Sequence, residues 1–380
     1  MRMPCNSLLN LAILMVSMAV LLPELCIAQS DNWVFPDKTW SVKTPSELGV
    51  DAAGLEKFSR TVKGTGTVIK DGYMIYSWGQ ETERPFDWFS AAKPVLSTLL
   101  FVAITEGRVK SVDDPVAAWG WDFRDKDKGI TFRHLADMTS NYACKESPGK
   151  AYSYNDCAIN LYAKTLKKVF AASLIEAGVS RLMNPLQFQD GRIFSPPEYM
   201  EGMRVLCTTR DFARIGWLWV NRGRWGGRQV IPRELFDQYC KADVPGSMPR
   251  GHSRKDQVDD YLNVDSYGGG INQTAEGPGI YGFNWWFNRN MDDPNKLTWP
   301  AAPSDTFIAY GRWGTDVMAM FPSLGLVVAA DTDGTDGTWG DFVTGDPNSV
   351  LNRNLGILAD SVRKSSAGCC QSATSPSSDK

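Results

Sequence analysis

An alcohol and an amine lie three residues apart at the head of a long apolar segment. In "FDWFSAAKPVLSTLLFVAITEG", which spans residues 86–107, they are Ser90 and Lys93, and Pro94 follows at once. Residues three apart on a helix share a face, so the amine can reach the hydroxyl. The free N–H groups and the positive dipole end of a helix start favour a developing negative charge. This arrangement suits a nucleophile that becomes an acyl-enzyme.

Pro94 is compatible with a helix that begins at Ser90. Because proline cannot donate to the carbonyl four residues back, such a helix loses only the bond to the Ser90 carbonyl. A residue before proline is disfavoured in the helical region, so we expect a constrained, non-helical backbone at Lys93 that helps to hold its amine on Ser90. The spacing alone nevertheless favours a simpler interpretation, an N-cap serine beside a surface lysine.

Other nucleophile and nucleotide motifs are missing. The chain has no G-x-S-x-G elbow and no G-x-x-x-x-G-K-[ST] loop, and no G-x-G-x-x-G follows a predicted strand. The only histidines are His134, on a helical pattern where a structural role is expected, and His252, in a basic loop. A serine hydrolase with this sequence is therefore not expected to use a histidine base. Further Ser-x-x-Lys matches lie in a turn, on the closing helix and in the tail, at Ser147, Ser361 and Ser377.

Composition indicates a soluble globular protein with a sizeable core. The 380 residues are 43% hydrophobic and 22% charged, and 40 basic and 43 acidic residues are mixed along the chain. No basic stripe stands out, so neither a nucleic-acid partner nor an anionic membrane partner is expected.

The two ends of the chain differ from the rest. Residues 1–28 combine an early Arg2, a short apolar core and Ala28 before a polar break, as in a secretory signal peptide. We therefore expect a secreted or periplasmic protein without stable membrane insertion of the mature chain; an uncleaved anchor is the alternative. The Ser-rich segment 365–380 is expected to be a disordered tail.

Four of the eight cysteines lie in these terminal segments, and four lie in the predicted domain. In an oxidising compartment Cys144 and Cys157 are the first candidates for a disulfide. Buried free thiols are the alternative for these two and for Cys207 and Cys240.

Strand patterns occur at both ends of the mature chain and helical patterns in its middle. A hairpin is predicted at residues 67–79, a helix at 91–105, short strands between about 281 and 331, and a closing helix after residue 347. We predict one α+β domain at 29–364, in which one antiparallel sheet from both termini is flanked by helices. Its α/β part comprises about 45–105 and 256–364, and a helical insertion subdomain comprises about 106–255.

The segment "DTDGTDGTWGD" places four carboxylates in a Gly-rich loop, at Asp331, Asp333, Asp336 and Asp341. Such loops can bind calcium, but the spacing misses the EF-hand pattern by one residue. We expect a solvated loop, and the sequence predicts neither a metal nor a cofactor.

Five stretches together resemble the β-lactamase-related serine hydrolases, which include class C β-lactamases, DD-peptidases, esterases and amidases. They are "SAAKPVLSTLLFVAITEGRVKSVDDPV", "ITFRHLADMTS", "SPGKAYSYND", "TTRDFARIGWLWVNRGRWGGRQVIP" and "FIAYGRWGTDVMAMFPSLGLVVAA". The resemblance covers roughly residues 45–335 and implies the β-lactamase/transpeptidase-like fold. Ordered agreement of several segments is far more specific than any one motif.

The resemblance implies roles for individual residues. Ser90 is the implied nucleophile and Lys93 its proton acceptor or electrostatic partner. The catalytic tyrosine is Tyr154, with Tyr152 as the alternative. The third motif falls on "YGRWGT", where backbone N–H groups near Gly311, Arg312 and Trp313 are expected to complete an oxyanion hole with the N–H of Ser90. Four tryptophans near the motifs, Trp88, Trp285, Trp286 and Trp313, either line an acyl pocket or pack in the core.

Two departures from the family pattern bear on substrate. Asp156 replaces the asparagine of Tyr-x-Asn; close to Lys93 it would hold that lysine cationic and favour Tyr154 as base. No lysine stands in the third motif to meet a substrate carboxylate, although Arg312 is a candidate substitute. We therefore expect a hydrolase of ester or amide bonds in small molecules or peptides. A β-lactamase or DD-peptidase and a non-catalytic binding relative are the alternatives.

Overall fold

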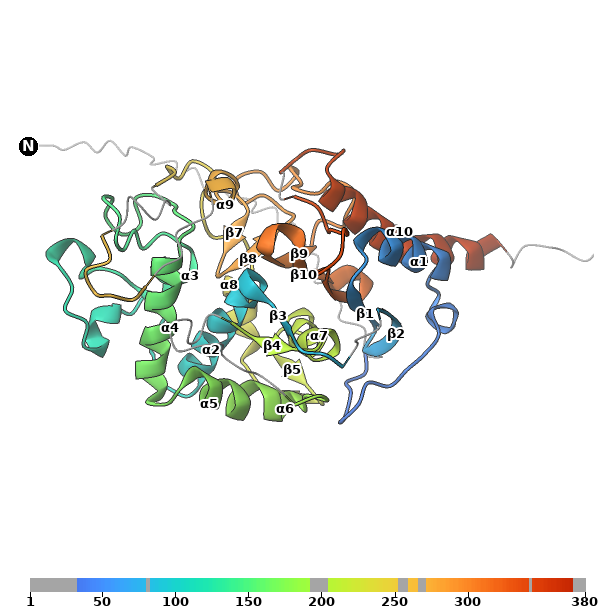
Figure 1. Ribbon diagram of the computed structural model, residues 1–380, viewed down its shortest axis with the longest axis horizontal. Coiled ribbons are helices and arrows are strands. Elements are labelled where there is room, and N and C mark those ends of the chain that lie inside the picture. Colours follow the sequence, from blue (N-terminus) through green and yellow to red (C-terminus); the bar gives the residue numbers. More distant parts are fainter. Residues whose placement is uncertain are drawn as a thin grey trace, which may run out of the picture.

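The computed structural model describes residues 33–79, 83–191, 204–251, 259–265, 271–341 and 344–371. The predicted signal peptide and His252 lie outside these residues. Figure 1 shows the helices and strands that position Ser90 and its neighbours.

A seven-stranded antiparallel sheet with the order β2-β1-β11-β10-β9-β8-β7 forms the centre of the molecule. Its strands are β1 (Thr65–Lys70), β2 (Tyr73–Trp78), β7 (Tyr281–Gly282), β8 (Trp285–Phe287), β9 (Phe307–Gly311), β10 (Asp316–Phe321) and β11 (Leu326–Asp331). Because β1 pairs with β11, from Thr65↔Asp331 to Lys70↔Leu326, the two ends of the chain share one sheet. The predicted α+β fold, with an antiparallel sheet from both termini, is confirmed.

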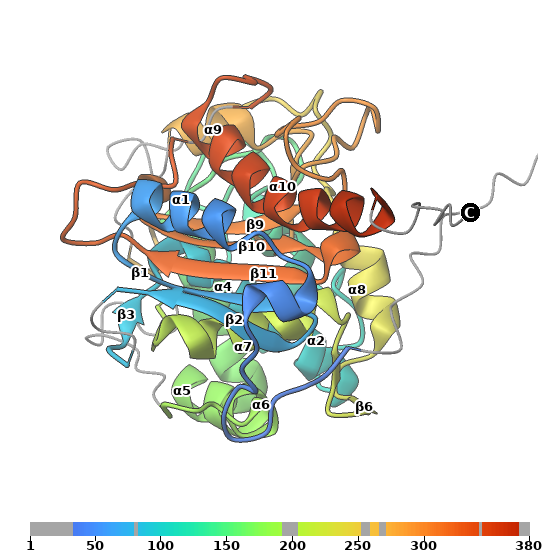
Figure 2. The same cartoon turned by 90° about the vertical axis from the view of Figure 1, so that its right-hand side faces the viewer.

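Helices cover both faces of this sheet. Figure 2 shows α1 (Ala52–Val62) and α10 (Val350–Gln371) on one side and α7 (Thr209–Val220) on the other. Gly216 lets α7 approach closely, since a Cβ there would lie 2.6 Å from the sulfur of Met318 and 2.8 Å from Val327. Although α7 falls within the part of the chain predicted as a helical insertion, it therefore packs directly on the sheet.

The remaining helices gather beside the sheet (Figure 1). They are α2 (Lys93–Thr105), α3 (Phe132–Ala136), α4 (Asp156–Phe170), α5 (Leu174–Gly178), α6 (Asn184–Leu186), α8 (Arg233–Tyr239) and α9 (Ile271–Glu276). All residues of α2 from Lys93 to Ala103 are buried. A helix that is apolar on every side belongs inside a protein. Helix α2 contacts α4 of the helical part.

Two short ribbons and two 3₁₀ turns complete the elements used below. The ribbons pair β3 (Phe86–Asp87) with β4 (Leu206–Cys207) and β5 (Arg224–Trp225) with β6 (Arg228–Gln229). The turns are η2 (Phe89–Ala92), directly before α2, and η8 (Arg312–Gly314), directly after β9.

The closing helix ends later than the sequence indicated. Helix α10 runs to Gln371, past the boundary predicted at residue 364. The segment that follows residue 364 contains no proline before Pro376, and an existing helix is extended at little cost. Residues 372–380 lie outside the described part of the chain.

The predicted disulfide between Cys144 and Cys157 is wrong. Neither cysteine is in a disulfide bond, and neither is Cys207 or Cys240. Cys144, Cys157 and Cys207 are buried separately in the interior, where cysteine serves as a small apolar side chain. Burial also raises the pKa of the Cys144 thiol to about 11, which keeps it protonated at neutral pH.

Candidate active site

Ser90 and Lys93 lie at the junction of η2 and α2. Lys93 is the first residue of α2, its side chain is only 2% exposed, and its Nζ lies 2.6 Å from Ser90 Oγ as a hydrogen-bond donor. A surface lysine beside an N-cap serine is therefore the wrong interpretation of this spacing. The Ser90 side chain is only half-buried, as a nucleophile that meets substrate must be.

The backbone of Lys93 differs from the expectation. Its φ of −53° and ψ of −40° are helical, although Pro94 follows. The bias against helical geometry before proline is moderate, and the buried Lys93 side chain, tied to its neighbours, overrides it. Because η2 is a 3₁₀ turn, the Ser90 carbonyl accepts the N–H of Lys93 in place of the missing N–H of Pro94.

The amine of Lys93 also meets Tyr154 and Asp156. It lies 5.0 Å from the centre of the Tyr154 ring and 3.5 Å from Asp156 Oδ1. Burial alone would lower the pKa of Lys93, but the negative forms of Tyr154 and Asp156 outweigh burial and raise it. Lys93 is therefore an ammonium group that donates to Ser90, rather than a free base.

Tyr154 is held from three sides. Its N–H donates to Thr274 Oγ1 in α9 at 3.0 Å, and its ring packs 5.9 Å from Trp286 in β8 and 6.0 Å from Tyr281. The next residue, Asn155, caps α4 by accepting the N–H of Ala158 at 2.8 Å. Thr274 was missed by the sequence analysis, because "INQTAEG" carries no motif that marks a supporting residue.

Tyr152 takes no part in this cluster. It is fully buried, its backbone pairs with Pro249 and Gly251, and its ring lies 5.4 Å from Tyr281. Its hydroxyl has no hydrogen-bond partner among the described residues. The structure thus brings Tyr154, and not Tyr152, to Lys93.

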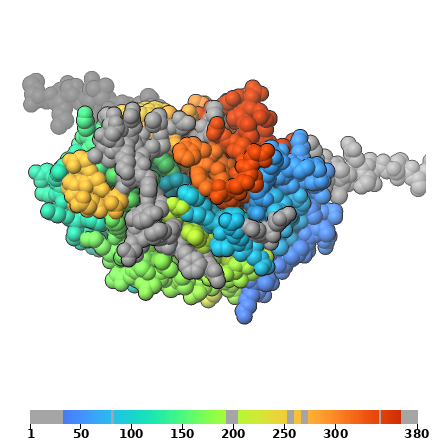
Figure 3. Space-filling model, in the orientation of Figure 1, coloured from blue at the N-terminus to red at the C-terminus, as the bar shows by residue number. Residues whose placement is uncertain are grey.

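The third motif lies directly against η2, the turn that contains Ser90. A Cβ at Gly311, the last residue of β9, would lie 2.9 Å from both the Ala91 nitrogen and the Trp88 oxygen. Only glycine therefore allows the end of β9 to approach the backbone around Ser90 so closely. In Figure 3, cyan atoms of the segment near residue 90 adjoin orange atoms of the segment near residue 310 on one face.

The guanidinium of Arg312 lies among acidic side chains. Its guanidinium donates to Asp316 at 3.0 and 3.2 Å and lies 3.1 Å from Asp333. Asp316 is fully buried in β10, and burial together with a hydrogen bond to Asp331 raises its pKa to about 9. Since acidic groups already bind Arg312, its charge is not equivalent to that of the lysine missing from the motif.

The predicted tryptophans fall into two groups. Trp88, Trp285 and Trp286 are at most 1% exposed, so core packing accounts for them, and Trp88 stacks on Phe212 with ring centres 4.1 Å apart. Trp313 in η8 is 67% exposed, beside Gly311 in sequence. Only Trp313 of the four therefore presents a broad apolar face to solvent.

The other sequence candidates have structural roles. His134 accepts the N–H of Thr131 at 3.2 Å in a reciprocal cap of α3, and burial lowers its pKa. Asp331 and Asp333 lie near Arg312, and Asp336 pairs with Lys63. Within the described ranges no group of three or more His, Cys, Asp or Glu side chains is arranged to hold a metal ion.

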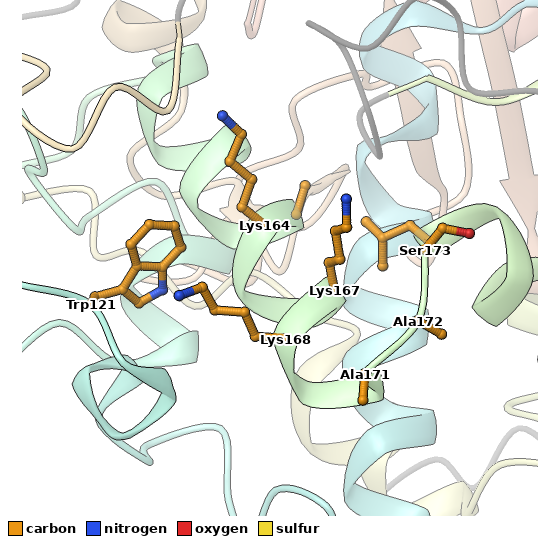
Figure 4. A pocket seen from close by; sticks show the side chains of 9 residues that line it. Trp121, Lys164, Lys167, Lys168, Ala171, Ala172 and Ser173 are labelled. Carbon is orange, nitrogen blue, oxygen red and sulfur yellow. The ribbon is translucent and has the colours of Figure 1, made fainter.

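A cavity of about 540 Å³ lies in the helical part, lined by Trp121, α4 and the start of α5. Figure 4 shows Lys164, Lys167 and Lys168 around it. These lysines belong to the C-terminal half of α4, where cations interact favourably with the helix dipole. The cavity contains neither Ser90 nor any member of its cluster, so we do not assign the chemistry to it.

Comparisons with known proteins show the family and the fold of the chain. The sequence model of the family described as Beta-lactamase matches residues 64–344. An uncharacterized protein of Alkalihalophilus pseudofirmus is 20% identical over 286 residues, which are 61% of this chain and 82% of that protein.

Solved structures show the same fold at low identity. A candidate 6-aminohexanoate-dimer hydrolase from Bacillus anthracis has a TM-score of 0.59 and 16% identity, covering 88% of this chain and 90% of that one. A family VIII carboxylesterase has a TM-score of 0.56 and 12% identity, covering 84% and 99%. Within the described residues, no helix is both long and apolar enough to cross a bilayer.

Proposed function

Because the chain belongs to the beta-lactamase family and is a serine hydrolase, we propose that it cleaves ester or amide bonds of small molecules or peptides through an acyl-enzyme on Ser90. One observation carries the proposal: a single buried ammonium, that of Lys93, donates to the Ser90 hydroxyl at 2.6 Å and lies 5.0 Å from the centre of the Tyr154 ring. The ammonium thus links the two side chains, and the Ser90 proton can pass to Tyr154 through one water or once bound substrate tightens the cluster.

In the proposed mechanism Tyr154 is the base and Lys93 the electrostatic partner. The Lys93 cation stabilises the Tyr154 phenolate, which accepts the proton of Ser90 as Oγ attacks the carbonyl. Backbone N–H groups of Ser90 and of the segment after β9 stabilise the oxyanion. Tyr154 then protonates the leaving alcohol or amine, and a water activated by the same pair releases the acid.

Electrostatics favour substrates without a carboxylate at the third motif. Arg312 is bound by Asp316 and Asp333, and Asp156 adds a carboxylate beside Lys93. Penicillins and peptidoglycan stem peptides would place their carboxylate where the family motif normally carries a lysine. Neutral esters and amides need no such cation, and the related fold of a family VIII carboxylesterase supports this class.

The test uses three substrates with wild type and Ser90→Ala. A short-chain nitrophenyl ester should be hydrolysed by wild type and not by the variant, whereas a chromogenic cephalosporin should be turned over at least ~100-fold more slowly, the loss expected for a missing charged contact. Fast cephalosporin turnover, or labelling by a fluorescent penicillin, would favour a β-lactamase or DD-peptidase. A folded protein that reacts with none of the three compounds would favour a non-catalytic binding relative.

We also propose that the protein is secreted or periplasmic. The proposal depends on the sequence of residues 1–28, whose apolar core and Ala28 predict cleavage before Gln29. N-terminal sequencing of protein purified from an expressing culture tests it; a chain that keeps its leader in a membrane fraction contradicts it.

A further inference from the structure

Phe89, the residue before the nucleophile, has a backbone that is unfavourable for its type. Its φ is 41°, in the left-handed region that non-glycine residues rarely adopt. Such a conformation persists only when surrounding groups fix it. What fixes Phe89 therefore also fixes the direction in which the chain enters Ser90.

Two arginines contact the ring of Phe89. The guanidinium carbon of Arg204 lies 3.7 Å from the ring centre, and that of Arg312 lies 4.3 Å from it. Phe89 as a whole residue is half-buried. A flat guanidinium over an aromatic ring is an attractive arrangement through the ring quadrupole.

Each arginine is in turn fixed by a carboxylate. Arg204 Nε donates to Asp87 Oδ1 at 2.7 Å, and the same oxygen accepts the N–H of Phe89 at 3.0 Å. Arg312 is held by the buried Asp316 through two hydrogen bonds of 3.0 and 3.2 Å. A guanidinium that donates two hydrogen bonds to one carboxyl group is fixed in its plane as well as in its position.

These contacts join three separate parts of the fold. Asp87 lies in β3, and Arg204 lies two residues before β4. Arg312 lies in the turn η8 between β9 and β10, Asp316 begins β10, and Phe89 belongs to η2. The segment that carries the nucleophile is thereby held between the ribbon and the sheet. We call Arg204, Phe89 and Arg312 the arginine–phenylalanine clamp.

We propose that the arginine–phenylalanine clamp is a positioning device, which holds the strained Phe89 backbone so that Ser90 Oγ stays on Lys93 and faces β9. The proposal rests on the function proposed for Ser90. It assigns Arg312 a role through Phe89 rather than in direct recognition of a substrate carboxylate. A small displacement of a nucleophile costs rate more than substrate binding, so the clamp should affect kcat and leave KM nearly unchanged.

The test compares Phe89→Leu with Phe89→Tyr, and uses Phe86→Leu as the matched control. Leucine removes the ring, tyrosine keeps it, and Phe86 is a half-buried phenylalanine of β3 whose ring lies 5.7 Å from the Arg84 guanidinium, outside the clamp. With a nitrophenyl ester, Phe89→Leu should lose ~10- to 100-fold in kcat with KM changed less than ~3-fold. Phe89→Tyr and Phe86→Leu should stay within ~3-fold of wild type.

Arg204→Lys adds a second measurement, since lysine keeps the charge and loses the flat face. Its loss of kcat should disappear in the background of Phe89→Leu, because the two changes break one contact. Wild-type kcat in Phe89→Leu, or losses that add in the double variant, would overturn the clamp. A loss of kcat that is fully explained by the fraction of unfolded protein, as measured by a thermal melt, would also overturn the clamp. A wild-type protein that does not hydrolyse the ester contradicts the proposed function itself. An active wild-type protein whose kcat is unchanged by Phe89→Leu contradicts only the clamp.

Discussion

Replacing Asp156 by asparagine isolates the charge that departs from the family pattern. Asp156 Oδ1 lies 3.5 Å from Lys93 Nζ, with exposed side-chain fractions of 18% and 2%. Coulomb's law at this distance gives roughly 1 kcal/mol at a dielectric constant of 80 and roughly 5 kcal/mol at 20. Loss of this attraction should lower the pKa of Lys93.

The sign of the effect follows from the role of Lys93. Asp156 is one of the groups that raise the pKa of Lys93, so its loss lets the ammonium lose its proton at lower pH. If the cation is the form that supports Tyr154, the alkaline limb of the profile of kcat/KM against pH should move to lower pH.

The assay is ester hydrolysis between about pH 6 and pH 11, with the uncatalysed rate subtracted at each pH. Asp265→Asn is the matched control, since Asp265 is a 60% exposed carboxylate that lies 3.7 Å from Lys164 on the same helical part. Its profile should match that of wild type. An alkaline limb that stays in place in Asp156→Asn, or a variant that gains activity because neutral Lys93 accepts the proton, would refute the reasoning.

Four further variants probe the site and its surroundings. Tyr154→Phe should lose ~100-fold or more in kcat, the usual contribution of a general base, whereas Tyr152→Phe should keep its activity and melt no lower than wild type, since the lost hydroxyl has no partner in the described structure. Gly311→Ala should lose at least ~10-fold in kcat/KM with an unchanged circular dichroism spectrum, because its Cβ would lie 2.9 Å from the Ala91 nitrogen; wild-type turnover would contradict that contact. Asp316 has a folded pKa of about 9 against an ordinary value of 3.8, so its contribution to stability is present in full below pH 4 and is lost as pH rises through 9. Urea titrations at pH 5, 7 and 9 should therefore show a steeper fall in the free energy of unfolding for wild type than for Asp316→Asn, and equal slopes would contradict the assignment.

The elements that carry strong local signals were predictable from the sequence. The hairpin at residues 67–79 appears as β1 and β2, and the apolar helix predicted at 91–105 appears as η2 and α2. Pairing of the first strands with the last ones followed from the order of the patterns along the chain and from the family resemblance. These features depend on hydrophobic periodicity and turn residues, and both are determined by residues close together in the sequence.

The details of the site depended on contacts between distant segments. The sequence favoured Tyr154 over Tyr152 only through the family motif, because two residues on one extended segment otherwise differ only in what packs against each. The pairing of Arg312 with Asp316 needed the turn η8, and the approach of Arg204 to Phe89 needed the β3–β4 ribbon. The helical backbone of Lys93 was missed because burial of its amine overrides a local preference.

Intact-mass spectrometry of the enzyme quenched during turnover of an activated ester tests the central claim most directly. We predict that wild type gains the mass of one acyl group, that peptide mapping places it on Ser90, and that Ser90→Ala remains unmodified. Turnover that continues in Ser90→Ala, or an acyl group found on another residue, would contradict an acyl-enzyme on Ser90.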